Sequence, residues 1–148
     1  GYFDYEQALS CAREQNKPLF LDFTGHGCVN CREMEARVLS DPKVLEILHE
    51  HYVVVALYVD ERHELPEDDW VVSDYDGKIK KTIGKQNIDF QMHRYNTNAQ
   101  PFYVLLDNQE RVLNDPIAYD LDIANFIEWL NAGIEEFKDR QDNSIAKK

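Results

Sequence analysis

The chain has 148 residues, of which 28 are acidic and 16 basic, giving a formal net charge of −12. Its length predicts one domain that buries a hydrophobic core without needing cross-links, and three cysteines are too few for a disulfide scaffold. A chain this acidic, with no basic stripe, is repelled by phosphate backbones, which excludes nucleic acid as an expected partner. The longest apolar run, 52–59, has the length of one strand and is too short to span a membrane.

The first sixty residues alternate between helical and strand patterns. Asp4 is placed to cap a helix that ends near Asn16, and its apolar face holds Tyr5, Ala8, Leu9 and Ala12. The apolar run 19–23 predicts a strand that contains one carboxylate, Asp22. After a glycine-bearing loop, a helix is expected over 29–39. Asp41-Pro42 starts the next helix, with Val44, Leu45, Ile47 and Leu48 on its buried side. The β-branched run 52–59 predicts a central strand covered on both faces.

The segment 60–82 interrupts this alternation. It holds eight acidic residues between Asp60 and Asp76, and the turn signal Asp76-Gly77 favours a hairpin between 70–72 and Ile79. We therefore expect an inserted acidic loop. The elements expected after it are a helix over 85–95, a strand over 102–106, an antiparallel return over 111–113 and a helix over 123–137.

This order predicts an α/β fold with parallel pairing first, an antiparallel hairpin at one edge and helices on both faces. A single domain over 1–138 is expected, followed by a frayed polar tail over 139–148. The chain begins at Gly1 rather than at methionine and has no signal peptide, a pattern typical of a trimmed or mature fragment.

Cys28 and Cys31 form a C-x-x-C pair where a loop leaves the strand 19–23 and a helix begins. Backbone N–H groups at a helix N-terminus favour a thiolate, so the pKa of Cys28 is expected to be lowered and its sulfur to be nucleophilic. Cys31, one turn later, is placed to resolve a mixed disulfide. The alternative is a pair of small buried hydrophobic residues, and Cys11 is expected to pack in that way on the first helix.

The segment from Asp22 to Arg32, DFTGHGCVNCR, resembles the active-site segment of thioredoxin-fold oxidoreductases, and Gln100-Pro101 resembles their cis-proline loop. CVNCREME, followed by SDPKV, is similar to the C-terminal thioredoxin-like domain of DsbD-type thiol:disulfide interchange proteins. The resemblance covers about 18–137. It implies a central mixed sheet flanked by helices, here with an N-terminal helix and an acidic insertion.

The same resemblance implies a protein-disulfide reductase that takes electrons from a membrane-embedded donor domain and passes them to other periplasmic thiol proteins. A periplasmic location follows, with a tether through a membrane portion upstream of Gly1. Protein thiols and disulfides are the expected partners of a monomer without cofactor or metal ion. The direction of electron flow is implied by the resemblance alone.

Two acidic residues match acids of the family. Asp22 corresponds to the buried acid beneath the cysteine pair, where an apolar strand is expected to raise its pKa and let it exchange a proton with Cys31. Glu35 is four residues after Cys31 and matches an acid that keeps the pair from ionising too easily. The alternatives are a strand-edge Asp22 that caps the next loop and a solvated Glu35.

Substrate contacts are implied around the proline and before the first cysteine. A cis Gln100-Pro101 bond would pack beside the pair and leave backbone free for an extended substrate, whereas a trans proline would simply start a strand. The family usually has Trp before its first cysteine, but this chain has Gly27 preceded by His26, so a flat aromatic wall is lost. His26 is expected either to act on the thiolate or to be a solvated loop histidine.

Two other classes of function stay open. The C-x-x-C pair is half of a structural zinc site, although no second cysteine pair follows, and His49 and His51 lie on different faces of a helix. A redox-inert binding module would use the acidic insertion for recognition. In either an enzyme or a module, the insertion is expected to repel acidic surfaces or to be a solvated loop.

Overall fold

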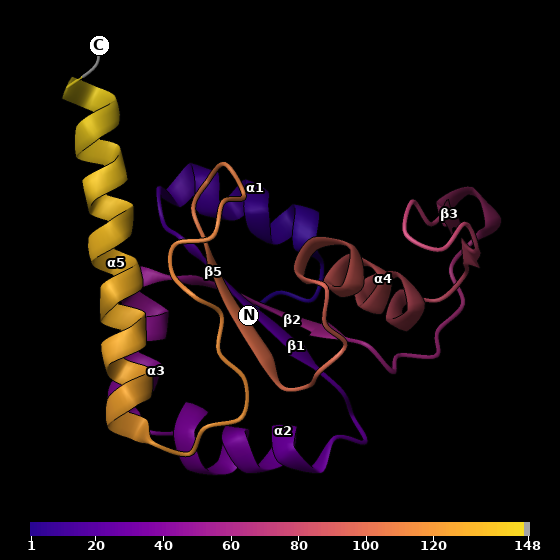
Figure 1. Cartoon of the computed structure of the whole chain (residues 1–148), viewed down its shortest axis with the longest axis horizontal. Coiled ribbons are helices and arrows are strands. Elements are labelled where there is room, and N and C mark those ends of the chain that lie inside the picture. The colour runs from indigo at the N-terminus through magenta and orange to yellow at the C-terminus, as the bar shows by residue number, and fades with distance from the viewer. Residues whose placement is uncertain (147–148) are drawn as a thin grey trace.

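The computed structural model describes residues 1–146 and has a three-stranded sheet between helices (Figure 1). In this sheet β1 (Leu19–Thr24) is central, parallel to β2 (Val53–Tyr58) and antiparallel to β5 (Phe102–Leu106). The helices are α1 (Tyr5–Gln15), α2 (Val29–Met34), α3 (Pro42–His51), α4 (Ile83–Tyr95) and α5 (Ile123–Ala146). The expected α/β class, mixed sheet and N-terminal helix are confirmed.

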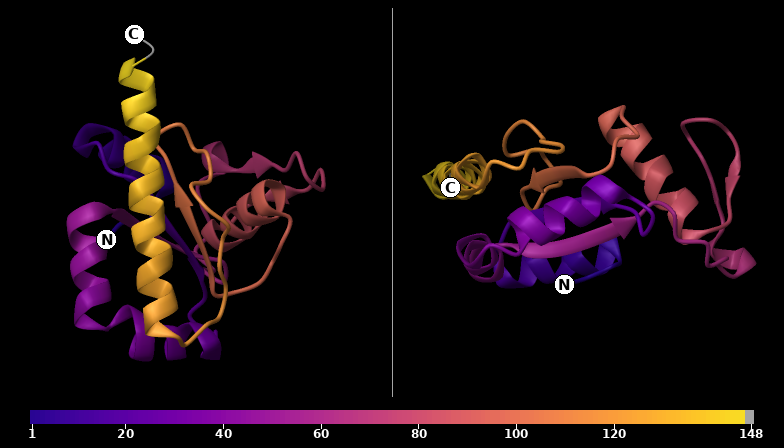
Figure 2. Two further views of the ribbon diagram at one scale, coloured as in Figure 1. Left: turned by 60° about the vertical axis from the view of Figure 1, so that its left-hand side comes forward. Right: turned by 90° about the horizontal axis from the view of Figure 1, so that it is seen from below.

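Side chains of β1 alternate between two hydrophobic clusters, one on each face of the sheet. Leu19, Leu21 and Phe23 pack against α1, with aromatic residues of α4 beside them. Phe20 belongs to the other cluster, with residues of α2, α3 and α5. Helices α3 and α5 run side by side in both orientations (Figures 1 and 2). Because the alternation has period two, Asp22 lies on the face that α2 and α5 cover.

Helix boundaries follow from their capping residues. The Asp4 carboxylate accepts the Gln7 N–H at the start of α1, as expected from the sequence. Asp41 accepts the Lys43 and Val44 N–H groups at the start of α3, where Pro42 takes the first helical position. The helix expected over 29–39 is present, but it changes from α2 to a π-helical segment at Glu35–Leu39.

The run 52–59 is the clearest departure from the sequence expectation, because β2 lies at the edge of the sheet and not at its centre. The N-terminal segment covers this edge: the Tyr2 N–H donates to Val54 O and the Ala56 N–H to Tyr2 O, both at 2.9 Å. The apolar run reflects instead the two hydrophobic clusters that its side chains meet, with Val54 against one and Val53, Val55 and Leu57 in the other. On α3, Leu45 is 51% exposed, so its expected burial is wrong.

The C-terminal part also differs from expectation. The return over 111–113 makes only an isolated bridge between Leu106 and Val112, not a strand. Helix α5 continues past 137 to Ala146, where a frayed tail was expected, and residues 147–148 lie outside the described part. Arg140 holds this extension by donating to the Asp107 carboxylate at 2.9 Å and to Val112 O at 3.0 Å.

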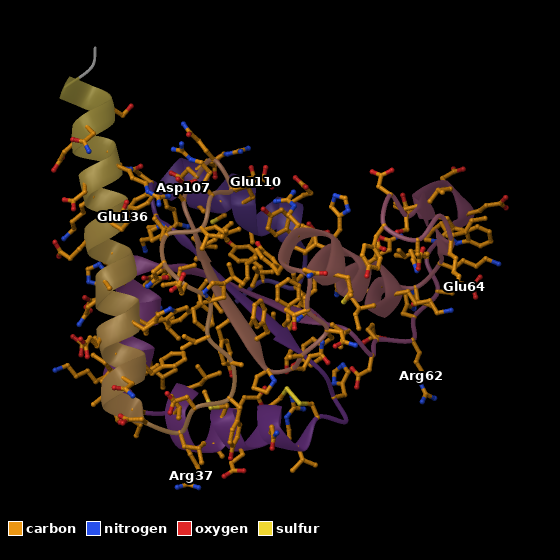
Figure 3. All side chains as sticks on the ribbon, in the orientation of Figure 1. Arg37, Arg62, Glu64, Asp107, Glu110 and Glu136 are labelled. Carbon is orange, nitrogen blue, oxygen red and sulfur yellow. A yellow bond between two sulfur atoms is a disulfide. The ribbon has the colours of Figure 1, made fainter. Side chains whose placement is uncertain are left out.

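The insertion forms a small sheet of its own, beyond α4 and away from α5 (Figure 1). Its strands β3 (Val71–Val72) and β4 (Ile79–Lys80) are antiparallel, so the expected hairpin is present. Gly77 adopts φ 74° in the turn, a conformation that glycine takes without strain. Figure 3 places Arg62 and Glu64 on the segment that leads from β2 to this hairpin.

Candidate active site

The cysteine pair lies where the chain leaves β1 and enters α2. Cys28 is the N-cap residue of α2 and is joined to Cys31 by a disulfide, visible as the yellow bond at the start of α2 (Figure 3). The Cys31 N–H also donates to Cys28 Sγ at 3.2 Å. Cys31 is only 2% exposed, whereas Cys28 is partly exposed. Cys28 is therefore the sulfur that a second protein can reach.

Asp22 lies in the sheet on the side of α2. It is 8% exposed, and Oδ1 has no hydrogen-bond partner among the described residues. Burial and the negative charge of Glu35 raise the pKa of Asp22 to about 7, although Arg32 acts in the opposite direction. A carboxyl group with this pKa gains and loses a proton near neutral pH.

Glu35 forms a two-point ion pair with Arg32. Arg32 Nε lies 3.0 Å from Glu35 Oε2, and its terminal nitrogen donates to Oε1 at 3.1 Å. The same guanidinium donates to His26 O at 3.3 Å, so it connects α2 to the loop before Cys28. Glu35 is therefore not simply solvated: its charge acts on Asp22 and is partly balanced by Arg32.

The loop before Cys28 rests on residues that follow β2. The Asp60 carboxylate accepts the His26 N–H at 2.8 Å and the Gly27 N–H at 2.9 Å. Partial burial opposes ionisation, but these donors outweigh it and hold the pKa of Asp60 below its usual value. The His26 ring stacks on Tyr58, with centroids 4.0 Å apart, and its Nε2 lies 3.5 Å from Glu61 Oε2.

Sequence reasoning did not single out Asp60 or Tyr58. A signal existed, because β1 and β2 are parallel and their carboxyl ends meet at one edge of the sheet. Residues that follow β2 therefore lie beside the loop that follows β1. The stack of His26 on Tyr58 supplies a flat ring surface near Cys28, where the loss of an aromatic wall was expected.

The proline loop enters the sheet beside the cysteine loop. The Gln100-Pro101 bond is cis, and Pro101 directly precedes Phe102, which pairs with Phe23 near the end of β1. Gln91 of α4 is fully buried, donates to Ala99 O at 2.8 Å and accepts from the Gln100 amide at 2.9 Å. Gln91 was also missed, because one glutamine in a helix does not identify its partner nine residues later.

Cys11 lies apart from this site. It sits on α1, across the sheet from α2, and its Sγ accepts from Tyr2 Oη at 2.9 Å and from the Gln15 amide at 2.8 Å. In residues 1–146, no group of three or more His, Cys, Asp and Glu side chains is arranged to hold a metal ion.

A mixed sheet that delivers a C-x-x-C pair from the end of its central strand is the arrangement of thioredoxin-like oxidoreductases. The chain belongs to the thioredoxin-like family, whose model matches residues 2–108. The pair within this fold suggests thiol–disulfide exchange. No curated protein matches the chain in sequence.

Three solved structures illustrate the likeness. The DsbH oxidoreductase has a TM-score of 0.68 at 18% identity, covering 91% of this chain and 84% of that one. A thioredoxin from Thermus thermophilus has a TM-score of 0.62 at 22% identity, covering 88% and 83%. The oxidised DsbD C-terminal domain of Neisseria meningitidis has a TM-score of 0.59 at 16% identity, covering 89% and 97%. At these identities the likeness establishes the fold. Within residues 1–146, no helix combines the length and apolar character that a membrane span requires.

Proposed function

We propose that this chain reduces disulfides in other proteins by dithiol–disulfide exchange through Cys28 and Cys31. One observation carries the proposal: the partly exposed Cys28 is bonded to the buried Cys31, on the face of the sheet where Asp22 is buried without a partner at Oδ1. An accessible sulfur suits the attacking group, and a protected sulfur suits the resolving group.

The exchange balances in two steps. The Cys28 thiolate attacks one sulfur of the substrate disulfide, forming a mixed disulfide and releasing one substrate thiolate, which takes up a proton. Cys31 then loses its proton and attacks Cys28 Sγ, which closes the disulfide and releases the second substrate thiol. Two electrons and two protons pass from the protein dithiol to the substrate disulfide.

Asp22 is proposed to take the Cys31 proton, because its pKa of about 7 allows both protonation states near neutral pH. Glu35 tunes this step through its charge, which favours the protonated form of Asp22. Gln100 and Pro101 are proposed to receive extended substrate backbone, with His26 and Gly27 forming the opposite side of the contact.

The pair must be reduced again after each cycle. A membrane-embedded dithiol donor domain is proposed as the reductant, which would transfer two electrons to the Cys28–Cys31 disulfide by the reverse exchange. We propose a periplasmic location for the domain on the same ground. The proposal is supported by the likeness to DsbD C-terminal domains and to the DsbH oxidoreductase.

Replacing the resolving cysteine tests the function directly. Cys31→Ser leaves Cys28 free to attack but unable to release its partner, so covalent mixed disulfides with disulfide-bearing proteins are expected on non-reducing gels. The matched control is Cys28→Ser, which retains Cys31 and Cys11 and should trap nothing. If no adduct forms and the wild-type pair shows no reversible oxidation in a glutathione titration, the chain is not an oxidoreductase. A zinc content near one per chain in the same sample would also contradict the oxidoreductase proposal.

A further inference from the structure

A groove of about 1140 Å³ lies between the N-terminal segment, α4 and the hairpin of the insertion. Its apolar lining includes Phe3, Val71 and Val72, which are 69%, 48% and 63% exposed. Side chains this apolar are normally exposed singly, whereas these three border one hollow. Figure 1 shows the hairpin next to α4, on the side of the molecule away from α5. We call this hollow the hairpin groove.

The charged side chains of the hairpin groove are predominantly carboxylates, and the N-terminal amino group of Gly1 also lines it. Four carboxylates contribute to its lining: Asp4, Glu6, Asp74 and Asp89. Its lysine and arginine are already paired, because Lys80 Nζ lies 2.6 Å from Asp76 Oδ2 and an Arg94 nitrogen lies 3.2 Å from Glu110 Oε1. Within residues 1–146, neither Glu6 nor Asp74 has a salt-bridge partner. The groove therefore complements a cationic partner that also carries apolar side chains.

A row of three neighbouring rings leads from the hairpin groove towards the cysteine site. Phe3 lines the groove, and its ring centroid lies 6.2 Å from that of Tyr58. Tyr58 stacks on His26 at 4.0 Å, and His26 is two residues before Cys28. A chain lying along these rings would reach from Cys28 to the groove in a few extended residues, since each residue spans about 3.3 Å.

We propose that the hairpin groove binds a basic segment with interspersed apolar side chains, belonging to the protein whose disulfide is exchanged at Cys28. The inference rests on the proposed function and names the class of substrate. The partner's apolar side chains cover Phe3, Val71 and Val72, while its Lys or Arg side chains face Glu6 and Asp74. The insertion is then a device that selects basic substrates and repels acidic ones.

Three model peptides test this proposal with the full chain. Each has the same small disulfide loop: one bears an arm of about ten residues that alternates Lys with Leu, one replaces Lys by Glu, and one has no arm. We expect the reduced wild type to have a higher kcat/KM for the Lys arm than for the Glu arm. The ratio of these two values should fall as salt is added, because exposed charges are screened.

The variant Glu6→Gln/Asp74→Asn removes two groove charges without touching a hydrogen bond of the fold. It is expected to lower the Lys-to-Glu ratio of kcat/KM about threefold to tenfold, the size of two exposed charge contacts. The matched control, Glu46→Gln/Glu135→Gln, removes two exposed charges from α3 and α5 and should leave the ratio unchanged. A second variant, Val72→Thr, keeps the β-branched shape and should weaken binding of a cysteine-free Lys–Leu arm, measured by fluorescence anisotropy.

The outcomes separate the two proposals. If the peptide without an arm is reduced but the two arms react equally, or if the groove variant keeps the preference, the docking inference is wrong and the oxidoreductase proposal stands. If no peptide is reduced, the proposed function fails, and absent binding of the cysteine-free arm then rejects the groove separately. Sedimentation that shows a dimer broken by the Val72→Thr change would assign the groove to a second copy of this chain and overturn the inference.

Discussion

Asp22 and Asp107 are both buried carboxylates beside the sheet, and they differ in what surrounds them. At Asp107, burial opposes ionisation, but the Arg111 N–H and the Arg140 guanidinium outweigh it and keep the pKa below its usual value. At Asp22, Oδ1 lacks a partner and the pKa is raised. Asp107 is thus satisfied as a structural carboxylate, whereas the incompletely satisfied Asp22 suits the proton exchange proposed for it.

This difference predicts how stability depends on pH. The pKa of Asp22 is about 7 in the native chain against about 3.9 when unfolded, so the native state binds more protons between these values. Stability from this group is complete below about pH 4 and is lost as pH rises through 7, by about 4 kcal/mol at high pH. Asp22→Asn cannot ionise, so the oxidised variant should exceed wild type in free energy of unfolding at pH 8 and gain much less at pH 5.

Urea denaturation of the oxidised wild type and Asp22→Asn at pH 5 and pH 8 measures these free energies of unfolding. Asp68→Asn, which removes an exposed charge from the insertion, serves as the control and should follow wild type at both. Parallel pH curves for wild type and Asp22→Asn would mean that Asp22 is already ionised in the native chain at pH 5, so that its pKa is not raised.

The sequence predicted some site residues and missed others for a physical reason. Cys28, Cys31 and Asp22 are adjacent along one strand–loop–helix unit, so local spacing places them. Asp60 accepts backbone N–H groups of a different segment, and Gln91 bonds the Ala99 carbonyl and the Gln100 side-chain amide. Such bonds leave no pattern in either segment. The sequence identifies both side chains as polar. It does not reveal that the Asp60 carboxylate supports the loop at His26 or that the Gln91 amide supports the loop at Gln100.

At the scale of elements, the helix caps and the strands were predictable from the sequence, whereas the lengths of the elements were less predictable. Asp4 and Asp41 cap the helices expected to start there, because an N-cap bond is local. The end of α5 was not predictable in the same way, because Arg140 stabilises it through Asp107, which is distant in sequence. The edge position of β2 escaped prediction because its side chains meet a hydrophobic cluster on each face of the sheet, as those of a central strand do.

Close packing of α5 on the sheet predicts the sign of a glycine substitution. In an isolated helix Ala is favoured over Gly by about 1 kcal/mol. A Cβ on Gly133 would lie 2.5 Å from Leu105 Cδ1 and 2.6 Å from Tyr52 Oη, and Tyr52 is already fixed by its bond to Leu130 O. We therefore expect Gly133→Ala to lower the free energy of unfolding by about 1–3 kcal/mol, as overpacked cores do.

Chemical denaturation checks this prediction. Asn131→Ala, at an exposed position on the same helix, is the matched control and should raise stability by a few tenths of a kcal/mol through propensity alone. A stabilising Gly133→Ala would show that α5 moves away from β5 without loss, and that the helix is less tightly packed than the contacts at Leu105 indicate.

For the whole molecule, the net charge of −12 is not spread evenly, because eight acids lie between Asp60 and Asp76. The main sheet and the two-stranded sheet of the insertion share no strand pairing in the described residues. Composition and turn signals predicted the hairpin, since both are local. Composition and turn signals did not predict the groove that the hairpin forms with Phe3, because this groove depends on the N-terminal segment and α4 lying against the hairpin.

Because the insertion makes its own sheet, its outer part should be removable. The Ile83 N–H donates to His63 O at 3.3 Å, so Glu64–Lys81 can be replaced by Gly-Gly with the chain ends already adjacent, and Thr82 remains to cap α4. The lost contacts, such as Trp70 Nε1 to Leu65 O, lie mostly within the insertion. A shorter loop also recovers on the order of 1 kcal/mol of closure entropy.

The expected result is an unchanged circular dichroism melting profile to within a few degrees, and an unchanged Cys28–Cys31 reduction potential in a glutathione titration. A chain that fails to fold would make the insertion part of the structural core, whereas a shifted potential with an intact fold would mean that its acids act on the thiolate and not only on the partner.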